Sequence, residues 1–392
     1  MEFKIPFSGR AHTYTNEEID AVVEAMRMAN PLTQGKYLNA FEKKFSKYVG
    51  ANNAFAVSNA TCGLEMAAQL CQFQPGDEVI VPSHTFTSSV YPFIKKGANV
   101  VWADIDLKAR VVTPETIAPK ITAKTRAIVV VHLYGYGADM PSIMELAKKH
   151  NLLVIEDAAQ SLGVDIDGTY TGSFGDIGIF SFHSHKNVST LGEGGMVTVA
   201  KDNMASILPM LRHNGHTAFE YDRKDYWVPA MGDLKLPQLN GDDLWPNNFC
   251  MGEAECALGI KLLDRIEKIN QEKRQRALRL IDNLKDFPEL EWHRVDSPRH
   301  NYHLLVARMI NGRRNEFIRK MAFEKRIQCI VQYCPLNRHP LYQKAGFGEA
   351  ECPNADNFFD SMVSFPFHHW LSEEDMNTLL LSTREVLISM RS

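Results

Sequence analysis

A single lysine stands between an apolar run and a glycine-rich turn in the stretch FSFHSHKNVSTLGEGGMV, residues 180–197. The apolar run predicts a strand, and a second strand-like sequence follows the glycines. Glycines in such a turn permit positive φ angles and a close approach of the backbone to a ligand. The lysine, Lys186, can there bind phosphate, pair with a carboxylate or form a Schiff base. The residues at other strand ends indicate which of these three roles applies to Lys186.

Two further stretches place chemically useful residues at the ends of apolar runs. VIEDAAQSLG, residues 154–163, puts Asp157 where a strand ends, and its carboxylate can hold a cation, act as a base or cap a helix. SNATCGLEMAAQ, residues 58–69, is typical of a strand-to-helix junction with small and hydroxylated side chains. The N–H groups of a helix N-terminus can bind phosphate, although an ordinary helix cap explains the pattern equally well. The stretch contains neither GK[ST] nor GxGxxG.

Taken together, these features fit one cofactor. Phe86, in PSHTFTSS, follows another strand end, where its ring can cover a planar ligand or join the core. A lysine, an acid, a phosphate cradle and an aromatic ring at one sheet edge fit pyridoxal phosphate. The lysine would form the Schiff base, and the acid would keep the pyridine nitrogen protonated so that the ring accepts electrons.

The elements that must position these residues alternate between strands and helices. This alternation predicts βαβ units, a mainly parallel sheet and ligand binding beyond the carboxyl ends of its strands. The predicted strands are AFAV (54–57), EVIVP (78–82), ANVVWADI (98–105), TRAIVVV (125–131), LLVIED (152–157) and IGIFSF (177–182). The polar residues at or just after such ends are Asn59, His84, His132, Asp157 and Ser181.

The second half of the chain is less regular. Residues 213–248 are rich in Gly, Pro, Asp and Trp, which favours an ordered loop that meets a ligand or a partner subunit. A long helix is predicted from about Met251. Further strands are predicted at 292–296, 302–310 and 328–334, and helices at 313–326 and 372–390. We therefore expect a large domain over 1–255, whose N-terminal segment packs on a smaller α/β domain over 256–392.

Composition narrows the class of protein. The 392 residues are 45% hydrophobic and 23% charged with a net charge of −4, which is typical of a globular protein and lacks the basic footprint of a nucleic-acid binder. No secretory signal and no apolar run of membrane-spanning length is present, so we expect a cytoplasmic protein without membrane contact. The seven cysteines form no CxxC pair, which argues against a disulfide framework and a metal site.

Motifs along nearly the whole chain resemble the DegT/DnrJ-type sugar aminotransferases, a branch of the fold-type I pyridoxal phosphate enzymes. The resemblance rests on residues 180–197 together with PLTQGKYLNAFEKKF, VSNATCGLEMAAQ, PGDEVIVPSHTF, VHLYGYGADM, IEDAAQSLG, GSFGDIGIFSFH, LRHNGH and NNFCMGEAECALGIKLL, in this order. It implies a large domain with a mainly parallel sheet covered by helices, and a smaller C-terminal α/β domain.

The resemblance also implies roles for individual residues. Lys186 would bind the cofactor as a Schiff base and carry the proton between substrate and cofactor. Asp157 would pair with the pyridine nitrogen, Gln160 would reach the ring hydroxyl, and Phe86 would stack on the ring. The cofactor phosphate would be held by Ala60, Thr61 and Ser181.

Asn248 matches a family position that reaches the phosphate of a neighbouring subunit, which implies a homodimer with shared active sites. His183 belongs to the family's SFH motif and would line the site. His185 has no counterpart in the expected pattern, so we expect a surface histidine or one that supports the site from behind.

The resemblance implies L-glutamate as amino donor and a sugar carbonyl as acceptor. Cys250 and the long segment 216–246 depart from the family pattern where the sugar would bind. The leading acceptor is 3,8-dideoxy-8-oxo-manno-octulosonate, which gives an 8-amino sugar acid for lipopolysaccharide. The alternative is a nucleotide-linked 3- or 4-keto-6-deoxy sugar. An acidic acceptor would need cationic partners, for which the candidates are Arg212, His213, His216 and Arg338.

A remoter alternative is a sugar dehydratase or a non-catalytic regulator on the same scaffold. The dehydratase branch typically replaces the Schiff-base lysine with histidine. His185 precedes Lys186, but the register of FSFH puts Lys186 at the lysine position. A regulator would not need the complete set of Lys186, Asp157 and Gln160. We therefore expect an aminotransferase.

Overall fold

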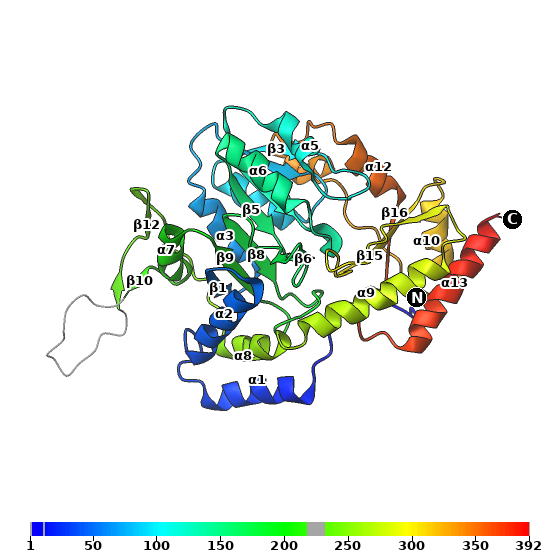
Figure 1. Ribbon diagram of the computed structural model, residues 1–392, viewed down its shortest axis with the longest axis horizontal. Coiled ribbons are helices and arrows are strands. Elements are labelled where there is room, and N and C mark those ends of the chain that lie inside the picture. Colours follow the sequence, from blue (N-terminus) through cyan, green and yellow to red (C-terminus); the bar gives the residue numbers. More distant parts are fainter. Residues whose placement is uncertain (1, 11, 218–231, 392) are drawn as a thin grey trace.

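The computed structural model (Figure 1) describes residues 2–10, 12–217 and 232–391. Its centre is a seven-stranded sheet with the strand order β1-β9-β8-β5-β4-β2-β3. In that order the strands are β1 (Asn53–Val57), β9 (Gly195–Val199), β8 (Ile177–Ser181), β5 (Leu153–Asp157), β4 (Thr125–Val131), β2 (Glu78–Pro82) and β3 (Asn99–Ala103).

Only β9 reverses direction within this sheet. It pairs antiparallel with β1 and β8, whereas β8, β5, β4, β2 and β3 pair parallel with one another. The predicted mainly parallel sheet is therefore confirmed, and each of the six predicted strands overlaps a strand of this sheet. Because β8 and β9 are antiparallel neighbours, the loop that carries Lys186 stays at the edge where β8 ends.

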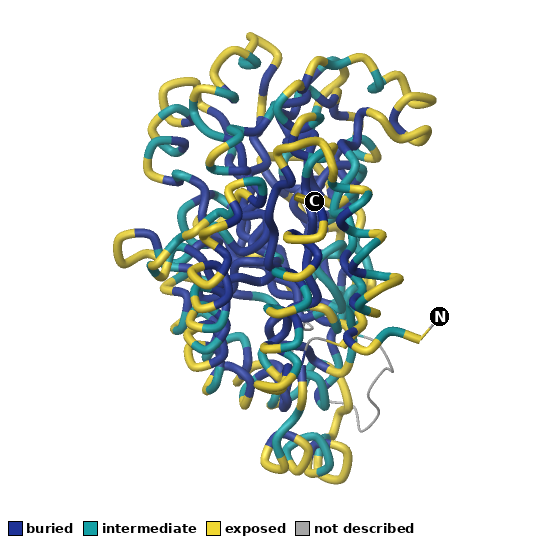
Figure 2. Tube along the Cα trace, turned by 90° about the vertical axis from the view of Figure 1, so that its right-hand side faces the viewer, coloured by how far each residue is buried: buried dark blue, intermediate teal, exposed yellow. Residues whose placement is uncertain are grey.

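Helices cover both faces of the sheet, so its strands are buried (Figure 2). Strand β1 shows the alternation: Ala54 and Ala56 join a core with α2 (Lys36–Val49) and α8 (Glu253–Leu262), whereas Val57 faces the opposite core. That opposite core also contains buried residues of α3 (Ala60–Leu70), α6 (Met140–His150) and α7 (Asp202–Arg212). Burial on both faces explains the nearly continuous apolar strand sequences.

A second, antiparallel sheet lies toward the C-terminus (Figure 1). It has the order β14-β15-β16 and a hydrophobic cluster of its own, which includes Ile5 from the N-terminal segment. Its elements are β14 (Leu290–Trp292), β15 (Leu305–Met309), β16 (Met362–Phe365), α9 (Ile266–Asn283), α10 (Arg314–Phe323) and α13 (Glu373–Arg391). We propose this part as the core of the smaller domain, although a boundary at residue 256 would fall inside α8.

Short elements complete the described chain. They are α1 (Asn16–Met28), η1 (Thr87–Ser89), α4 (Tyr91–Lys95), α5 (Pro114–Ile117), η2 (Ala118–Lys120), η3 (Leu133–Gly135), β6 (Asp165–Ile166), β7 (Thr169–Tyr170), η4 (Leu336–Arg338), α11 (Pro340–Lys344) and α12 (Pro353–Ser361). In the described part of the chain, no helix has both the length and the apolar character needed to cross a membrane.

Several predicted elements of the second half differ from the structure. The predicted long helix is broken into α8 and α9, with a turn at residues 263–265. The predicted strand at 292–296 is wrong beyond Trp292, where β14 ends. The predicted strand at 328–334 is also wrong, because only Ile330 bridges to Ser364 before the chain turns away to form a wall of the cavity described below.

The irregular region 213–248 contains two short hairpins among its described residues. β10 (His216–Thr217) pairs with β11 (Asp233–Leu234), and β12 (Gln238–Leu239) pairs with β13 (Asp242–Asp243). Residues 218–231 of the expected substrate loop lie outside the described part of the chain.

Candidate active site

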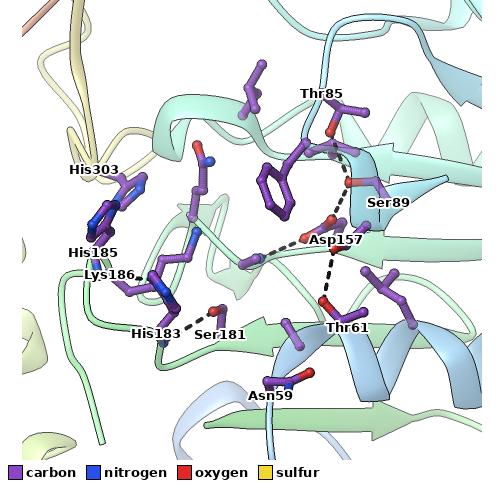
Figure 3. A pocket seen from close by; sticks show the side chains of 18 of the residues that line it. Asn59, Thr61, Thr85, Ser89, Asp157, Ser181, His183, His185, Lys186 and His303 are labelled. Carbon is purple, nitrogen blue, oxygen red and sulfur yellow. Dashed lines mark hydrogen bonds between the residues drawn. The ribbon is translucent and has the colours of Figure 1, made fainter. Parts of the chain in front are cut away.

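A cavity of about 740 Å³ opens beyond the carboxyl ends of β4, β5 and β8 (Figure 3). Asp157 and Ser181 line it from the last positions of β5 and β8, and Lys186 lines it from the loop after β8. The opposite side comes from distant segments, with Phe7, His303 and Tyr333 among the lining residues. The parallel sheet therefore brings the predicted catalytic pair to one edge, as expected of this topology.

Asp157 is buried, and neighbouring donors fix its carboxylate. The Ser89 hydroxyl donates to Oδ2 at 2.7 Å, and the backbone N–H of Ala159 donates to Oδ1 at 3.1 Å. Ser89 gives its proton to the carboxylate, so the Thr85 hydroxyl, 3.0 Å away, is the donor in the Thr85–Ser89 hydrogen bond. These two hydrogen bonds hold the buried carboxylate in one orientation.

Lys186 follows a tight turn, in which its backbone N–H donates to the His183 carbonyl at 2.8 Å. Its side chain is half-buried in the cavity. Burial lowers the pKa of the Lys186 amine to about 8, against the opposing effect of the negative charges of Asp157 and Glu193. An amine with this pKa is partly neutral near pH 7, and the neutral form is the nucleophile and the base.

The N-terminus of α3 forms a concave cradle beside Ser181. Asn59 caps the helix by accepting from the Cys62 N–H at 2.9 Å, which leaves the N–H groups of Ala60 and Thr61 without acceptors inside the helix. Gly195 permits the close approach of β9, since a Cβ there would lie 2.7 Å from the Ala60 nitrogen. The Thr61 hydroxyl donates to Ser88 at 2.9 Å. This geometry suits a phosphate group.

Gln160 and Phe86 also line the cavity. The Gln160 carbonyl oxygen accepts from the Tyr134 N–H at 2.7 Å, which orients its amide group toward Tyr333. Phe86 is 52% exposed, and its ring meets the Tyr333 ring edge-on at 6.0 Å. Phe86 thus faces the cavity instead of the core, as a ring that covers a ligand would.

The structure does not bring all predicted residues into this cavity. His183 lines it, whereas Asn248 forms a bridge with His213 while its neighbours Asn247 and Phe249 line the cavity. His213 packs against His216 with ring centroids 4.6 Å apart. Neither of these two histidines is a lining residue.

The two predicted arginines are engaged elsewhere in the fold. Arg212 is buried, pairs with Glu42 and donates to the Ala56 carbonyl at 2.7 Å. Arg338 lies at the surface, 3.2 Å from Asp356. Within the single chain both hold structure together, and their proposed contact with an acidic sugar stays a prediction.

Sequence reasoning missed several lining residues. Ser89 and Thr85 lie in the stretch quoted for Phe86, and hydroxyl groups near a strand end were the signal available. His303 and Tyr333 come from parts of the chain that carry no local signal. His185, expected at the surface or behind the site, is exposed and also lines the cavity.

The residues present fit pyridoxal phosphate. Lys186 offers an amine for a carbonyl, Asp157 a fixed carboxylate for a protonated ring nitrogen, and the α3 N-terminus a cradle for a dianion. The cavity therefore offers a negative group for the positive ring nitrogen of this cofactor and a positive helix end for its negative phosphate. These are placements in the fold, and the individual roles stay predictions.

Residues 13–382 match the family model described as the DegT/DnrJ/EryC1/StrS aminotransferase family. The chain is 31% identical over 395 residues to the spore coat polysaccharide biosynthesis protein SpsC of Bacillus subtilis, covering 99% of this chain and 97% of that protein. It is 30% identical to the GDP-perosamine synthase of Escherichia coli O157:H7, covering 86% and 85%. It is also 30% identical to the UDP-N-acetyl-3-dehydro-alpha-D-glucosamine 3-aminotransferase of Acidithiobacillus ferrooxidans, covering 90% and 89%.

Among solved structures, an aminotransferase from Psychrobacter cryohalolentis superimposes with a TM-score of 0.87 at 28% identity, covering 99% of this chain and 100% of the other. The PLP form of the sugar aminotransferase Spr1654 from Streptococcus pneumoniae superimposes with a TM-score of 0.84 at 24% identity, covering 99% of both chains. These likenesses extend over the whole architecture described above, and they bear out the expected fold-type I scaffold.

Proposed function

We propose a specific reaction for this chain, which belongs to the DegT/DnrJ/EryC1/StrS aminotransferase family and is a pyridoxal phosphate-dependent sugar aminotransferase. It transfers an amino group from L-glutamate to a ketone of a nucleotide-linked deoxy sugar. The support for a nucleotide-linked acceptor is that two relatives reported above carry names of GDP-linked and UDP-linked sugars. The amino sugar product would enter a surface polysaccharide.

The observation that carries the proposal is the convergence of Lys186, Asp157 and the α3 cradle on one cavity. When bound, pyridoxal phosphate supplies an electron sink for the carbanion formed at Cα of the amino donor. Asp157 holds a proton on the ring nitrogen. The Lys186 amine removes the proton from Cα, and the low pKa of this lysine keeps part of it in the basic form.

The octulosonate aldehyde that led the sequence analysis has no support in the names of these relatives. We include this aldehyde as the acidic compound among the sugars to be tested in the experiment below. The dehydratase alternative would require the loss of the lysine, and Lys186 lines the cavity.

We also propose a homodimer in which Asn248 reaches the partner's phosphate site. Asn248 is not a lining residue of its own chain's cavity, although Asn247 and Phe249 on either side of it are. Asn248 thus lies outside the cavity of its own chain while both of its neighbours line it. This arrangement is the one expected of a residue that acts in the partner's active site.

The experiment follows the visible absorption of the cofactor-loaded protein through its two half-reactions. L-Glutamate should bleach the band, and one sugar carbonyl should restore it. The panel contains a GDP-linked 4-keto-6-deoxy sugar, a UDP-linked 3-keto sugar and the octulosonate aldehyde. Lys186→Ala is the inactive control, and Lys268→Ala, on a side chain 77% exposed, is the surface control.

Each outcome identifies or rejects a substrate class. Recovery with a nucleotide-linked sugar supports the proposal, and recovery with the octulosonate alone overturns the nucleotide-linked acceptor. A band that glutamate leaves unchanged overturns L-glutamate as the amino donor.

A further inference from the structure

His185 lines the cavity from the loop that carries Lys186, and the residue is exposed. Its ring packs edge-on against His183 with centroids 5.1 Å apart, and its backbone N–H donates to His183 Nδ1 at 3.3 Å. A Cβ placed on Gly9 would lie 3.4 Å from His185 Nε2, so the N-terminal segment passes next to this nitrogen. Figure 3 shows His185 and His303 together on the side of the cavity away from Asp157.

A buried lysine of α9 holds both sides of this region. The Lys273 amine donates at 2.9 Å to the Asn187 side chain and at 2.9 Å to the His303 carbonyl, and it lies 5.3 Å from the centre of the Phe367 ring. Asn187 follows Lys186 in the chain, and Phe367 is another lining residue. The Lys273 side chain thus connects the lysine loop to two segments of the opposite wall, so the position of His185 depends on a rigid frame.

The imidazoles of this wall are electrically neutral near pH 7. Burial lowers the pKa of His185 and of His303, and the positive charge of Lys186 acts in the same direction on both. The carboxylate of Glu193, in the same loop, lies 3.7 Å from His183 Nε2 and so approaches the His183 ring. A neutral imidazole offers one N–H donor and one acceptor nitrogen, which matches a hydroxyl group better than it matches a carboxylate.

We propose that His185 determines specificity for the acceptor by binding a hydroxyl group of the sugar, and that it does not contribute to recognition of the amino donor. The inference deepens the proposed function and rests on it. An amino acid donor carries two carboxylates and no hydroxyl groups, whereas a deoxy sugar presents several hydroxyls around a ring. The sugar is also the larger substrate, and the cavity reaches from Asp157 to the wall where His185 lies (Figure 3).

The test measures the two half-reactions of the cofactor-loaded enzyme separately, since glutamate bleaches the band and the sugar restores it. For His185→Ala, we expect the apparent KM for the sugar to rise about tenfold, the magnitude of one lost hydrogen bond. We expect the glutamate half-reaction to stay within about twofold. His185→Gln, which keeps a donor and an acceptor, should recover part of the loss. His150→Ala, at an exposed position, is the matched control.

The possible outcomes separate this proposal from the function on which it rests. If His185→Ala slows both half-reactions equally, or neither, the specificity role is overturned while the aminotransferase assignment stands. If His185→Gln behaves like His185→Ala although both keep the thermal stability of the parent, hydrogen bonding by this side chain is overturned. If no sugar of the panel restores the band in the parent enzyme, the proposed function fails, and this inference fails with it.

Discussion

The two sides of the cavity are built in different ways. On the side of the sheet, Asp157 and Ser181 stand at the ends of buried strands and the α3 cradle follows β1 directly. On the other side, His185 and His303 lie in loops, and the hydrogen bonds of Lys273 connect these two loops. The first side suits a constant task, which is to hold a cofactor. The residues of the second side can vary without disturbing the sheet. The second side is therefore the suitable place for selecting a sugar.

The comparison predicts that changes on the sheet side affect both half-reactions. Asp157→Asn keeps the size of the side chain and an acceptor for the Ser89 hydroxyl, but it removes the negative charge. We expect a loss of about 100-fold in the rate with glutamate and in the rate with the sugar, the magnitude of one lost electrostatic contact in an active site. Stopped-flow absorbance of the loaded enzyme measures both rates.

Ser89→Ala is the milder companion, because it removes one hydrogen bond to Asp157 and leaves the charge. It should lower both rates by about tenfold. If Asp157→Asn changed the sugar rate alone, the division of tasks between the two sides would be wrong.

Much of the sheet side could be predicted from the sequence. Buried parallel strands have a strong apolar signature, and the residues at or just after their ends lie at the ligand-binding edge. This rule predicts the positions of Asp157, Ser181 and the start of α3 from the sequence. The reversed direction of β9 could not be read from its sequence, because an apolar strand has the same pattern in both directions.

The opposite side was largely beyond prediction. His303 and Tyr333 reach the cavity through contacts between residues far apart in the chain, which no local pattern encodes. The stretch 328–334 has strand-like composition, yet only Ile330 pairs, since the following residues serve as cavity wall. His185 was expected at the surface or behind the site because it has no counterpart in the family pattern, and the lack of a counterpart does not predict its place on the cavity wall.

Lys186 lies between the two sides of the cavity, and a carboxylate from each side affects its pKa. Burial lowers its pKa to about 8, whereas Asp157 on the sheet side and Glu193 in the loop both raise it. Cofactor-free protein attaches pyridoxal phosphate through the neutral amine, so the rate of attachment should rise with pH and level off above about 8. Glu193→Gln removes one negative charge, so it should move this midpoint to lower pH and increase the rate at pH 7 by less than about tenfold.

The measurement is the appearance of the visible band after mixing cofactor-free protein with pyridoxal phosphate at a series of pH values. Glu349→Gln, at an exposed position, controls for the change in net charge. A midpoint that Glu193→Gln leaves in place would mean that only the sheet side sets the basicity of Lys186.

The smallest expected effect concerns Lys273, which joins the two sides and is 2% exposed. Burial lowers its pKa in the fold to about 7, whereas an unfolded lysine titrates near about 10.4. Between these values the unfolded chain binds the extra proton, so the free energy of unfolding increases with pH, by up to about 1.4 kcal/mol per pH unit. Lys273→Met removes this contribution.

Urea unfolding of the cofactor-free protein at pH 7.5 and pH 9 measures the difference. The parent should gain about 1–2 kcal/mol more than Lys273→Met over this interval. Lys186 titrates in both proteins and cancels, and Lys268→Met should behave like the parent. An equal gain in Lys273→Met would mean that this lysine titrates alike in the folded and unfolded chain. The hydrogen bonds to Asn187 and His303 would then hold a permanently charged ammonium group, and the neutral imidazoles of that wall would face a full positive charge at every pH of interest.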